Sequence, residues 1–133
     1  MSKGLVVQKY GGSSVANVKR IQKVAQRVVG YSKKGYQLVI VVSALGDTTD
    51  ELIELADKIN PNPSQREMDM LLSTGEQISV ALLAMAIHKL GARAISFTGS
   101  QVGIITDTSH TQARIIKING NKIKEELKKG NIV

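Results

Sequence analysis

Hydrophobic residues in the first third of the chain follow two different periods. Between residues 15 and 29 apolar side chains recur at steps of three and four, which predicts a helix with one buried face. Residues 38–42 are consecutive apolar residues rich in β-branching, as expected for a strand covered on both faces in a parallel sheet. A shorter apolar run at residues 5–7 predicts an earlier strand. These segments together predict a strand–helix–strand unit.

Polar residues and glycines predict where the first helices begin and end. Ser13 or Ser14 is suited to cap the first helix, and Gly35, or Gly30 before it, to end that helix. Residues 47–49 are suited to cap a second helix, which the two prolines at positions 61 and 63 then end.

The second half of the chain continues the alternation. Residues 64–67 form a capping-box pattern that predicts a helix, and residues 73–76 are expected to break or bend it. Residues 78–90 predict a further helix, which should lie inside the domain because it is apolar nearly all round. The remaining predictions are a strand at 94–97, two short paired strands at 104–106 and 114–117, and a last helix from 119 or 120 to 130.

Helices that alternate with β-branched runs predict an α/β fold, a three-layer α/β/α sandwich with a mainly parallel sheet. A single domain over residues 1–133 fits the length of the chain. Residues 131–133 look like the start of another strand, and strands usually run about five or six residues. We therefore expect the sandwich to be incomplete and the sequence to be cut short.

The chain contains no cysteine, which excludes disulfides, thiolate nucleophiles and thiolate metal sites. A reducing, cytoplasmic setting is the expectation that follows. No run approaches the roughly 20 consecutive apolar residues of a membrane-spanning helix, so no membrane association is expected.

Charge is distributed unevenly along this chain of net charge +7. Residues 1–46 contain eight Lys or Arg and no Asp or Glu, whereas the acidic residues all lie in 47–133. Such a basic segment could attract nucleic acid or a small polyanion such as a nucleoside triphosphate. Three Tyr, one Phe and no Trp leave little material for stacking bases, so nucleic acid is the less favoured partner.

Residues 9–14, Lys-Tyr-Gly-Gly-Ser-Ser, are expected to lie where the first strand turns into the first helix. Ligands of open α/β sheets bind at this carboxyl edge. Paired glycines allow close approach to the backbone, exposed amides favour an anion, and Lys9 adds a full positive charge. The segment matches neither the Walker-A loop nor the dinucleotide fingerprint. A plain tight turn with two capping serines is the alternative interpretation.

Ser43 and the residues 47–49 follow the second strand, so their side chains could face the same crevice and bind an acidic small molecule. Helix capping is the alternative explanation for Asp47, Thr48 and Thr49. Glu76 lies at the mouth of the expected apolar helix, where it could receive a ligand's ammonium group or could simply stabilise a first helical turn. The two histidines have no neighbouring ligand, so no intrinsic metal site is expected.

Four ordered segments of this chain resemble the aspartate kinases of the amino-acid kinase superfamily. Residues 9–15, KYGGSSV, resemble that family's KFGGTSV, with Tyr10 and Ser13 retaining a ring and a hydroxyl. Residues 42–52, 68–79 and 96–101 are similar to its further signatures. The resemblance covers the N-terminal half of the kinase domain and implies the amino-acid kinase fold. The family's nucleotide-binding half and its regulatory ACT domains would lie beyond Val133.

The resemblance implies transfer of the γ-phosphoryl group of ATP, with Mg²⁺, to the side-chain carboxylate of L-aspartate, at the start of lysine, threonine and methionine biosynthesis. Because a carboxylate is already ionised at neutral pH, this nucleophile needs no general base. By the resemblance Lys9 is catalytic. Phosphate contacts are implied for Lys9, Tyr10, Gly11, Gly12, Ser13 and Ser43, and amino-acid contacts for Ser43, Asp47, Thr48, Thr49 and Glu76.

Two other functions remain open at this stage. A superfamily kinase for another amino acid would share the glycine turn, and a non-catalytic basic module would bind nucleic acid or a partner chain. Whichever holds, an incomplete sheet exposes an unpaired edge. We therefore expect the chain alone to be inactive and to form a homo-oligomer or self-associate through that edge.

Overall fold

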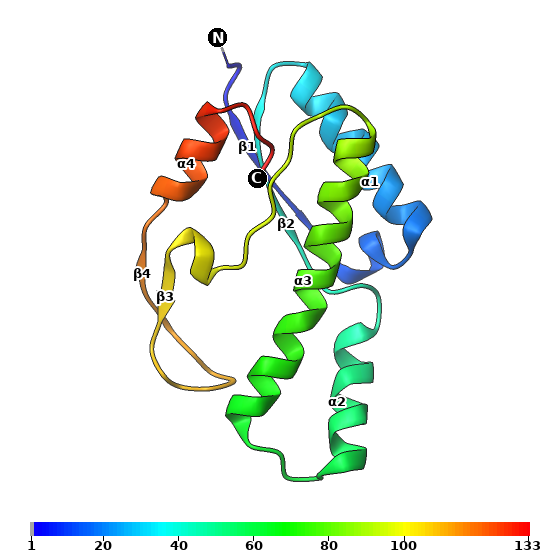
Figure 1. The fold of residues 1–133 in the computed structure, drawn as a ribbon, viewed down its shortest axis with the longest axis vertical. Helices are drawn as coiled ribbons and strands as arrows, with labels where there is room; N and C mark the ends of the chain where they lie inside the picture. The colour runs from blue at the N-terminus through cyan, green and yellow to red at the C-terminus, as the bar shows by residue number, and fades with distance from the viewer. Residues whose placement is uncertain (1) are drawn as a thin grey trace.

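The computed structural model describes residues 2–133 of the protein (Figure 1). Strands and helices alternate through the first half of the chain, and a strand pair and a short helix follow. In order, the elements are β1 (Leu5–Tyr10), a 3₁₀ turn (Gly12–Val15), α1 (Val18–Lys33), β2 (Gln37–Val42), α2 (Thr48–Ile59), α3 (Gln65–Lys89), a second 3₁₀ turn (Ser100–Val102), β3 (Ile104–Thr106), β4 (Ile115–Ile118) and α4 (Asn121–Lys128).

A parallel sheet forms the centre of the molecule. β1 and β2 pair in parallel, from Leu5 opposite Gln37 to Tyr10 opposite Val42. Residues 132–133 lie beside β2, since the Val133 amide donates to the Leu38 carbonyl at 3.1 Å. On their other side Ile132 bridges Ala94 in parallel. Both expected strands, at 94–97 and 131–133, are reduced to this one bridge, and residue 133 adds backbone hydrogen bonds to β2.

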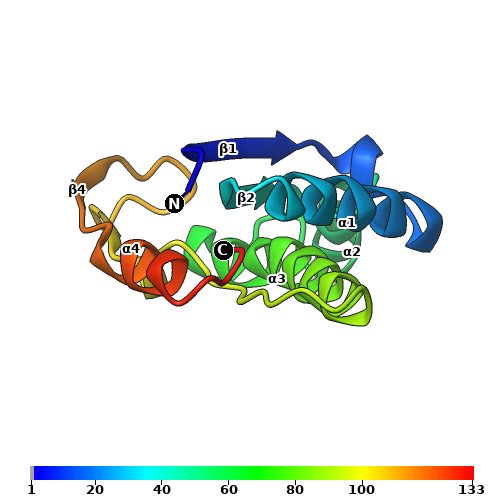
Figure 2. The ribbon, with the colours of Figure 1, turned by 90° about the horizontal axis from the view of Figure 1, so that it is seen from above.

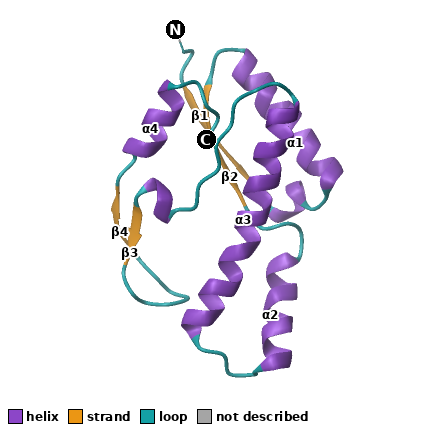
Figure 3. Ribbon diagram, viewed as in Figure 1, coloured by secondary structure: helices purple, strands orange, loops and turns teal. Residues whose placement is uncertain are grey.

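Helices cover the two faces of the sheet unequally. Figures 1, 2 and 3 show α1 and α3 on one side of the strands, and α4 with the antiparallel β3–β4 pair on the other. The core lies on the α1 side and includes Val28, Leu38 and Ile87. On the opposite face Leu5 and Val7 are 56% and 62% exposed. Three layers are therefore present, as predicted, but the second face of the sheet is only partly covered.

α3 is one continuous helix of 25 residues, so the expected break at residues 73–76 is wrong. The Ser73 and Thr74 hydroxyls donate to carbonyls one turn earlier, at 2.9 and 2.7 Å, so their hydrogen bonds are made within the helix. A Cβ on Gly75 would lie 3.0 Å from the Ala44 Cβ. Glycine is placed here because the helix approaches the loop after β2, and that approach is not visible in the local sequence.

Only one stripe of α3 is buried, which contradicts the expectation that its apolar half lies wholly inside. Gly75, Ser79, Leu83 and Ile87 face the core, whereas Met85 is 63% exposed. By length and composition α3 could cross a membrane, with a mean hydropathy of 1.5 over 18 residues, of which 22% are buried. The hydropathy of α3 therefore does not exclude a membrane-spanning helix, contrary to the expectation from the sequence. A core helix of a globular protein passes the same test of length and hydropathy.

The beginning of α1 also differs from its prediction. Asn17, not Ser13 or Ser14, caps the helix, because its side chain accepts a bond from the Arg20 amide at 3.0 Å. The two serines instead belong to the 3₁₀ turn that follows β1. The end of the helix is as expected, with Gly35 in the left-handed region at φ 93°.

Glu126 ties the end of α4 to residues 131–133. Its side chain is buried, and its two oxygens accept bonds from Lys129 Nζ at 2.7 Å and Asn131 Nδ2 at 2.6 Å. The hydrogen bond from Lys129, and after it that from Asn131, lowers the pKa of the Glu126 carboxyl. The ionised carboxylate thus holds the chain as it enters the sheet.

This lowered pKa predicts a dependence of stability on pH. A carboxyl whose pKa is lower in the folded protein stabilises it fully above its unfolded value of 4.5, and this contribution is lost as pH falls through the folded pKa. We expect Glu126→Gln to reduce the free energy of unfolding at neutral pH. The free energies of unfolding at neutral pH and at about pH 3 should then differ less in the variant than in the unmodified protein. Urea unfolding at both pH values measures this. Glu125→Gln, an exposed neighbour, is the control and should leave the difference unchanged.

Candidate active site

Two turns at the carboxyl edge of the sheet are joined by backbone hydrogen bonds. The Ser43 amide donates to the Tyr10 carbonyl, and the Gly46 amide to the Gly12 carbonyl, both at 3.0 Å. A Cβ on Gly12 would lie 2.9 Å from the Gly46 carbonyl oxygen. Since backbone atoms cannot move aside cheaply, only glycine fits at position 12. The turn after β1 and the loop after β2 therefore form one rigid edge.

α3 is attached to the same edge by a buried hydrogen bond. The Ser79 hydroxyl donates to the Ser43 carbonyl at 2.7 Å, and Ser79 is 1% exposed. This contact brings Glu76, one turn away, to the loop after β2. Because the helix begins eleven residues earlier, at Gln65, Glu76 does not occupy a first turn. Stabilisation of a helix N-terminus, the alternative explanation of this residue, is thereby excluded.

Lys9 and Tyr10 point to opposite faces of β1. Lys9 shares the exposed face with Leu5 and Val7, and its register partner is Val41. The Tyr10 ring packs against the core on the α1 side, where burial raises the pKa of its hydroxyl. Tyr10 is thus placed to contribute its backbone rather than its ring to the carboxyl edge. No ion pair within residues 2–133 engages the Lys9 ammonium.

The glycine turn has unused backbone donors. The Ser14 amide bonds the Gly11 carbonyl at 3.0 Å, but within residues 2–133 the amides of Gly12 and Ser13 have no hydrogen-bond partner. Space around Gly11 is open, because no atom lies within 4 Å of the position that a Cβ would take there. Free amides beside a lysine form a concave, positively polarised surface of the kind that binds anions.

The loop after β2 presents polar side chains at the same edge. Asp47 occupies the N-cap position of α2, but its side chain makes no capping hydrogen bond. Capping therefore does not account for Asp47. Thr48 is half-buried, with its methyl group near Gly75, and Thr49 is exposed. Ser43 is half-buried and has its carbonyl held by Ser79.

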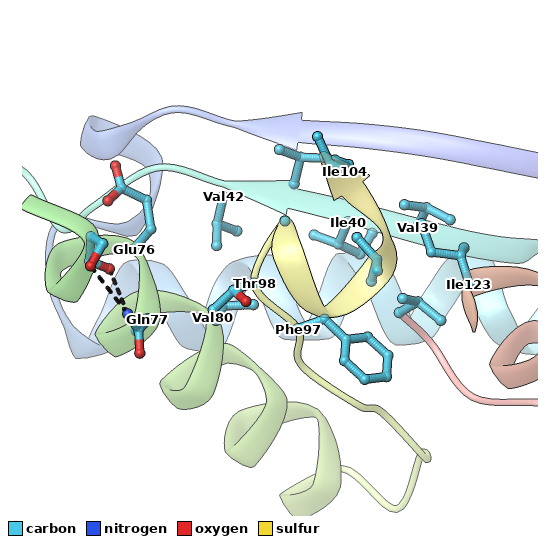
Figure 4. A pocket seen from close by; sticks show the side chains of 15 residues that line it. Val39, Ile40, Val42, Glu76, Gln77, Val80, Phe97, Thr98, Ile104 and Ile123 are labelled. Atoms are coloured by element: carbon cyan, nitrogen blue, oxygen red, sulfur yellow. Dashed lines mark hydrogen bonds between the residues drawn. The ribbon is translucent and has the colours of Figure 1, made fainter. Parts of the chain in front are cut away.

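A cavity of about 450 Å³ lies between β2, α3 and the segment before β3 (Figure 4). Glu76 and Gln77 lie at one end of it, and Val39 and Ile123 at the other. Among the residues predicted for the site, Glu76 alone lines this cavity. Four consecutive residues of β2, Val39, Ile40, Val41 and Val42, also line it, whereas Lys9 does not.

Sequence reasoning missed other polar residues of this cavity. Ser73, Gln77 and Thr98 line it, and the Gln77 amide donates to the Ser73 carbonyl at 3.1 Å. Their segments belong to the family signatures, but no local spacing distinguishes these side chains from ordinary surface residues. Within residues 2–133 the Glu76 carboxylate has no hydrogen-bond or ion-pair partner, so it is available to a cation at the cavity mouth.

A parallel sheet with a glycine turn, free amides and a lysine at its carboxyl edge is typical of the α/β class, whose ligands bind at that edge. The chain belongs to the amino acid kinase family, whose model matches residues 4–133. Its similarity to individual members narrows the class further. It is 57% identical over 129 residues to the aspartokinase of Mycolicibacterium smegmatis and 55% identical over 130 residues to that of Geobacillus stearothermophilus.

Solved structures agree with these relatives. The aspartate kinase from Synechocystis superposes with a TM-score of 0.83 at 50% identity, over 97% of this chain and 21% of that one. Aspartokinase III of E. coli, in complex with aspartate and ADP, superposes with a TM-score of 0.81 over 96% of this chain and 39% of that one. At 19% identity this second likeness concerns the fold alone. The chain spans about a third of the length of the curated relatives, 31% of the Mycolicibacterium protein.

The close contact at Gly12 predicts a difference between two adjacent glycines. Gly12→Ala places a Cβ 2.9 Å from a carbonyl oxygen and should destabilise the fold by about 1–3 kcal/mol. Gly11→Ala is the matched control, since its φ of −73° and its open surroundings accept a methyl group. Its effect should stay within about 0.5 kcal/mol. Urea-unfolding midpoints measure both, and equal shifts would contradict the assigned contact.

Proposed function

We propose that the protein containing this chain is an aspartate kinase, which transfers the γ-phosphoryl group of ATP to the side-chain carboxylate of L-aspartate. The observation that carries the proposal is the hydrogen-bonded edge that joins the glycine turn after Lys9, the loop after β2, and α3, which carries Glu76. The aspartokinases at 53–57% identity support it, as does the Synechocystis aspartate kinase at 50% identity.

The reaction needs positioning and charge neutralisation rather than a base. A carboxylate oxygen of aspartate attacks the γ-phosphorus, the bond to the β-phosphate oxygen breaks, and ADP leaves with its electron pair, which yields 4-phospho-L-aspartate. We assign to the Lys9 ammonium the neutralisation of the equatorial phosphoryl oxygens. The free amides of Gly12 and Ser13 would donate to the same group, and the open space at Gly11 would admit it.

The amino-acid substrate is proposed to lie toward α3. Glu76 would receive its ammonium group, because the carboxylate is unpaired within residues 2–133 and lines the cavity. Ser43 and the side chains of Asp47, Thr48 and Thr49 would supply hydrogen bonds at the loop after β2. Tyr10 would act through its backbone.

Magnesium would enter with the nucleotide. Within residues 2–133 no group of three or more His, Asp or Glu side chains could hold a metal ion. Mg²⁺ commonly keeps several waters and is held by substrate phosphates with one or two carboxylates. Asp47 is the carboxylate at this edge that could contribute, and the ion would neutralise phosphate charge beside Lys9.

We propose further that the chain by itself is inactive, acts in the cytoplasm as part of the longer protein, and self-associates through its exposed apolar surfaces. Leu5, Val7 and Val41 form one such surface on the sheet, and Ile78 and Met85 another on α3. Uncovered surfaces of this kind favour association between chains.

The role of Lys9 predicts a catalytic defect without a folding defect. Lys9→Met in the full-length protein should lower kcat by about 10²–10³-fold, since it removes a charge aimed at the transition state. Its exposure predicts that stability changes by no more than about 0.5 kcal/mol. Lys19→Met, an exposed lysine of α1, is the control and should retain the parent rate. A Lys9 variant within a few-fold of the parent rate would remove Lys9 from this role.

The role of Glu76 predicts a defect in substrate binding. Glu76→Gln keeps the size of the side chain but removes the charge that would pair with the ammonium group, so the KM for aspartate should rise about tenfold or more. The KM for ATP should change little. Steady-state kinetics with either substrate varied tests this, and Glu54→Gln on α2 serves as a surface control. An unaltered KM for aspartate would refute the assignment.

A further inference from the structure

The β3–β4 hairpin, residues 103–119, is weakly packed against the rest of the molecule. All four residues of β4 are exposed, as are two of the three residues of β3. At its base Gly103 packs against Asn119, whose amide donates to the Gly103 carbonyl at 2.9 Å. Apolar burial therefore does not hold the far end of the hairpin in place.

That far end is attached to α3 through a single carboxylate. The Thr111 amide donates to both oxygens of Asp69, at 3.1 and 3.2 Å, and Nδ1 of His110 lies 2.9 Å from Asp69 Oδ2. Thr111 has a φ of 61°, and within residues 2–133 it is the one non-glycine residue with positive φ. The backbone thus adopts a disfavoured conformation at the point where it meets Asp69.

The turn itself is held in shape from within. Asp107 accepts bonds from the Ser109 amide at 3.1 Å and the Arg114 amide at 3.2 Å. These two backbone hydrogen bonds, Ser109 first, lower the pKa of the Asp107 carboxyl. Because these bonds close the turn, the contact with Asp69 is the attachment of a preformed unit to the helix.

The attachment lies beside the proposed amino-acid site. Asp69 precedes Glu76 by seven residues on α3, which is two turns or about 10 Å. Ser73, between them, lines the cavity, and Ile104 at the start of the hairpin lines it from the other side. In Figure 1 the hairpin follows the 3₁₀ turn Ser100–Val102, and the hairpin's own turn reaches the lower half of α3. α3 therefore borders the cavity on one side, and the hairpin reaches it through Ile104 at its base.

We propose that the β3–β4 hairpin is a flap over the amino-acid side of the site, and that Asp69 is the positioning residue that latches it. This inference rests on the proposed function. With the latch made, the wall formed by residues 98–104 is held against the cavity; without it, the flap samples open positions. Because opening reduces the fraction of protein competent to bind, the latch governs affinity for the amino acid rather than the chemical step.

The test replaces Asp69 in the full-length protein and measures the flap and the kinetics separately. Asp69→Ala should raise hydrogen exchange at the Thr111 amide and tryptic cleavage after Arg114 by about tenfold. The KM for aspartate should rise about fivefold or more, with kcat within about twofold. Asp69→Asn retains one acceptor for the Thr111 amide, so its effects should be intermediate. Glu67→Gln, on the same helix but paired with Arg66, is the control and should change none of these.

Each outcome separates the latch from the proposed function. Unchanged exchange at Thr111 would overturn the latch, and faster exchange with an unchanged KM would overturn its role at the site. If the unmodified protein fails to phosphorylate aspartate, the proposed function fails, while the exchange result still decides whether the latch exists. Should Asp69→Ala prove unstable, His110→Ala leaves α3 unaltered and should raise exchange and cleavage in the same direction.

Discussion

The hydrogen bond from the buried Ser79 hydroxyl to the Ser43 carbonyl is the interaction on which the site depends. It forms only because α3 approaches the loop after β2 closely, and Gly75 permits that approach by leaving room for the Ala44 side chain. On its other side the same loop packs against Gly12, where a Cβ atom would clash with the Gly46 carbonyl oxygen. These contacts hold the helix and the two turns, which are distant in sequence, so close together that their backbones touch. Glu76 reaches the carboxyl edge through this packing and through no contact of its own.

Two charged side chains at this edge are not paired within the protein. Lys9 is exposed near the end of β1, Glu76 lines the cavity, and neither has an ion-pair partner within residues 2–133. Exposed charges of this kind contribute little to stability, so both can be replaced without unfolding the chain. Backbone contacts hold this edge together, whereas the Lys9 and Glu76 side chains do not. Substitutions of these two residues can therefore test their proposed roles without unfolding the protein.

Periodicity predicted the elements whose burial is local, and failed where distant contacts decide. The apolar run at 38–42 and the three- and four-residue steps of 15–29 correspond to β2 and α1. The break expected at 73–76 is absent because Gly75 serves packing against Ala44, which no local pattern reveals. The motifs predicted that the two turns and Glu76 lie near one edge of the sheet, and their roles there stay predictions. The polar lining from Gln77 and Thr98 was not predicted, because it depends on the folded cavity.

Water is the competitor that any such site must exclude, since it too can accept a phosphoryl group. On the proposed amino-acid side the hairpin meets α3 at Asp69, and Ile104 at its base lines the cavity. Around Lys9, by contrast, Leu5 and Val7 leave the sheet face open to solvent. The proposed transfer therefore requires that face to be covered when ATP is bound, and apolar side chains flanking a lysine are suited to packing against the protein that covers it. In the proposed reaction the cavity lined by Glu76 would hold the amino acid, and packing onto the exposed apolar residues beside Lys9 would exclude water from the phosphates.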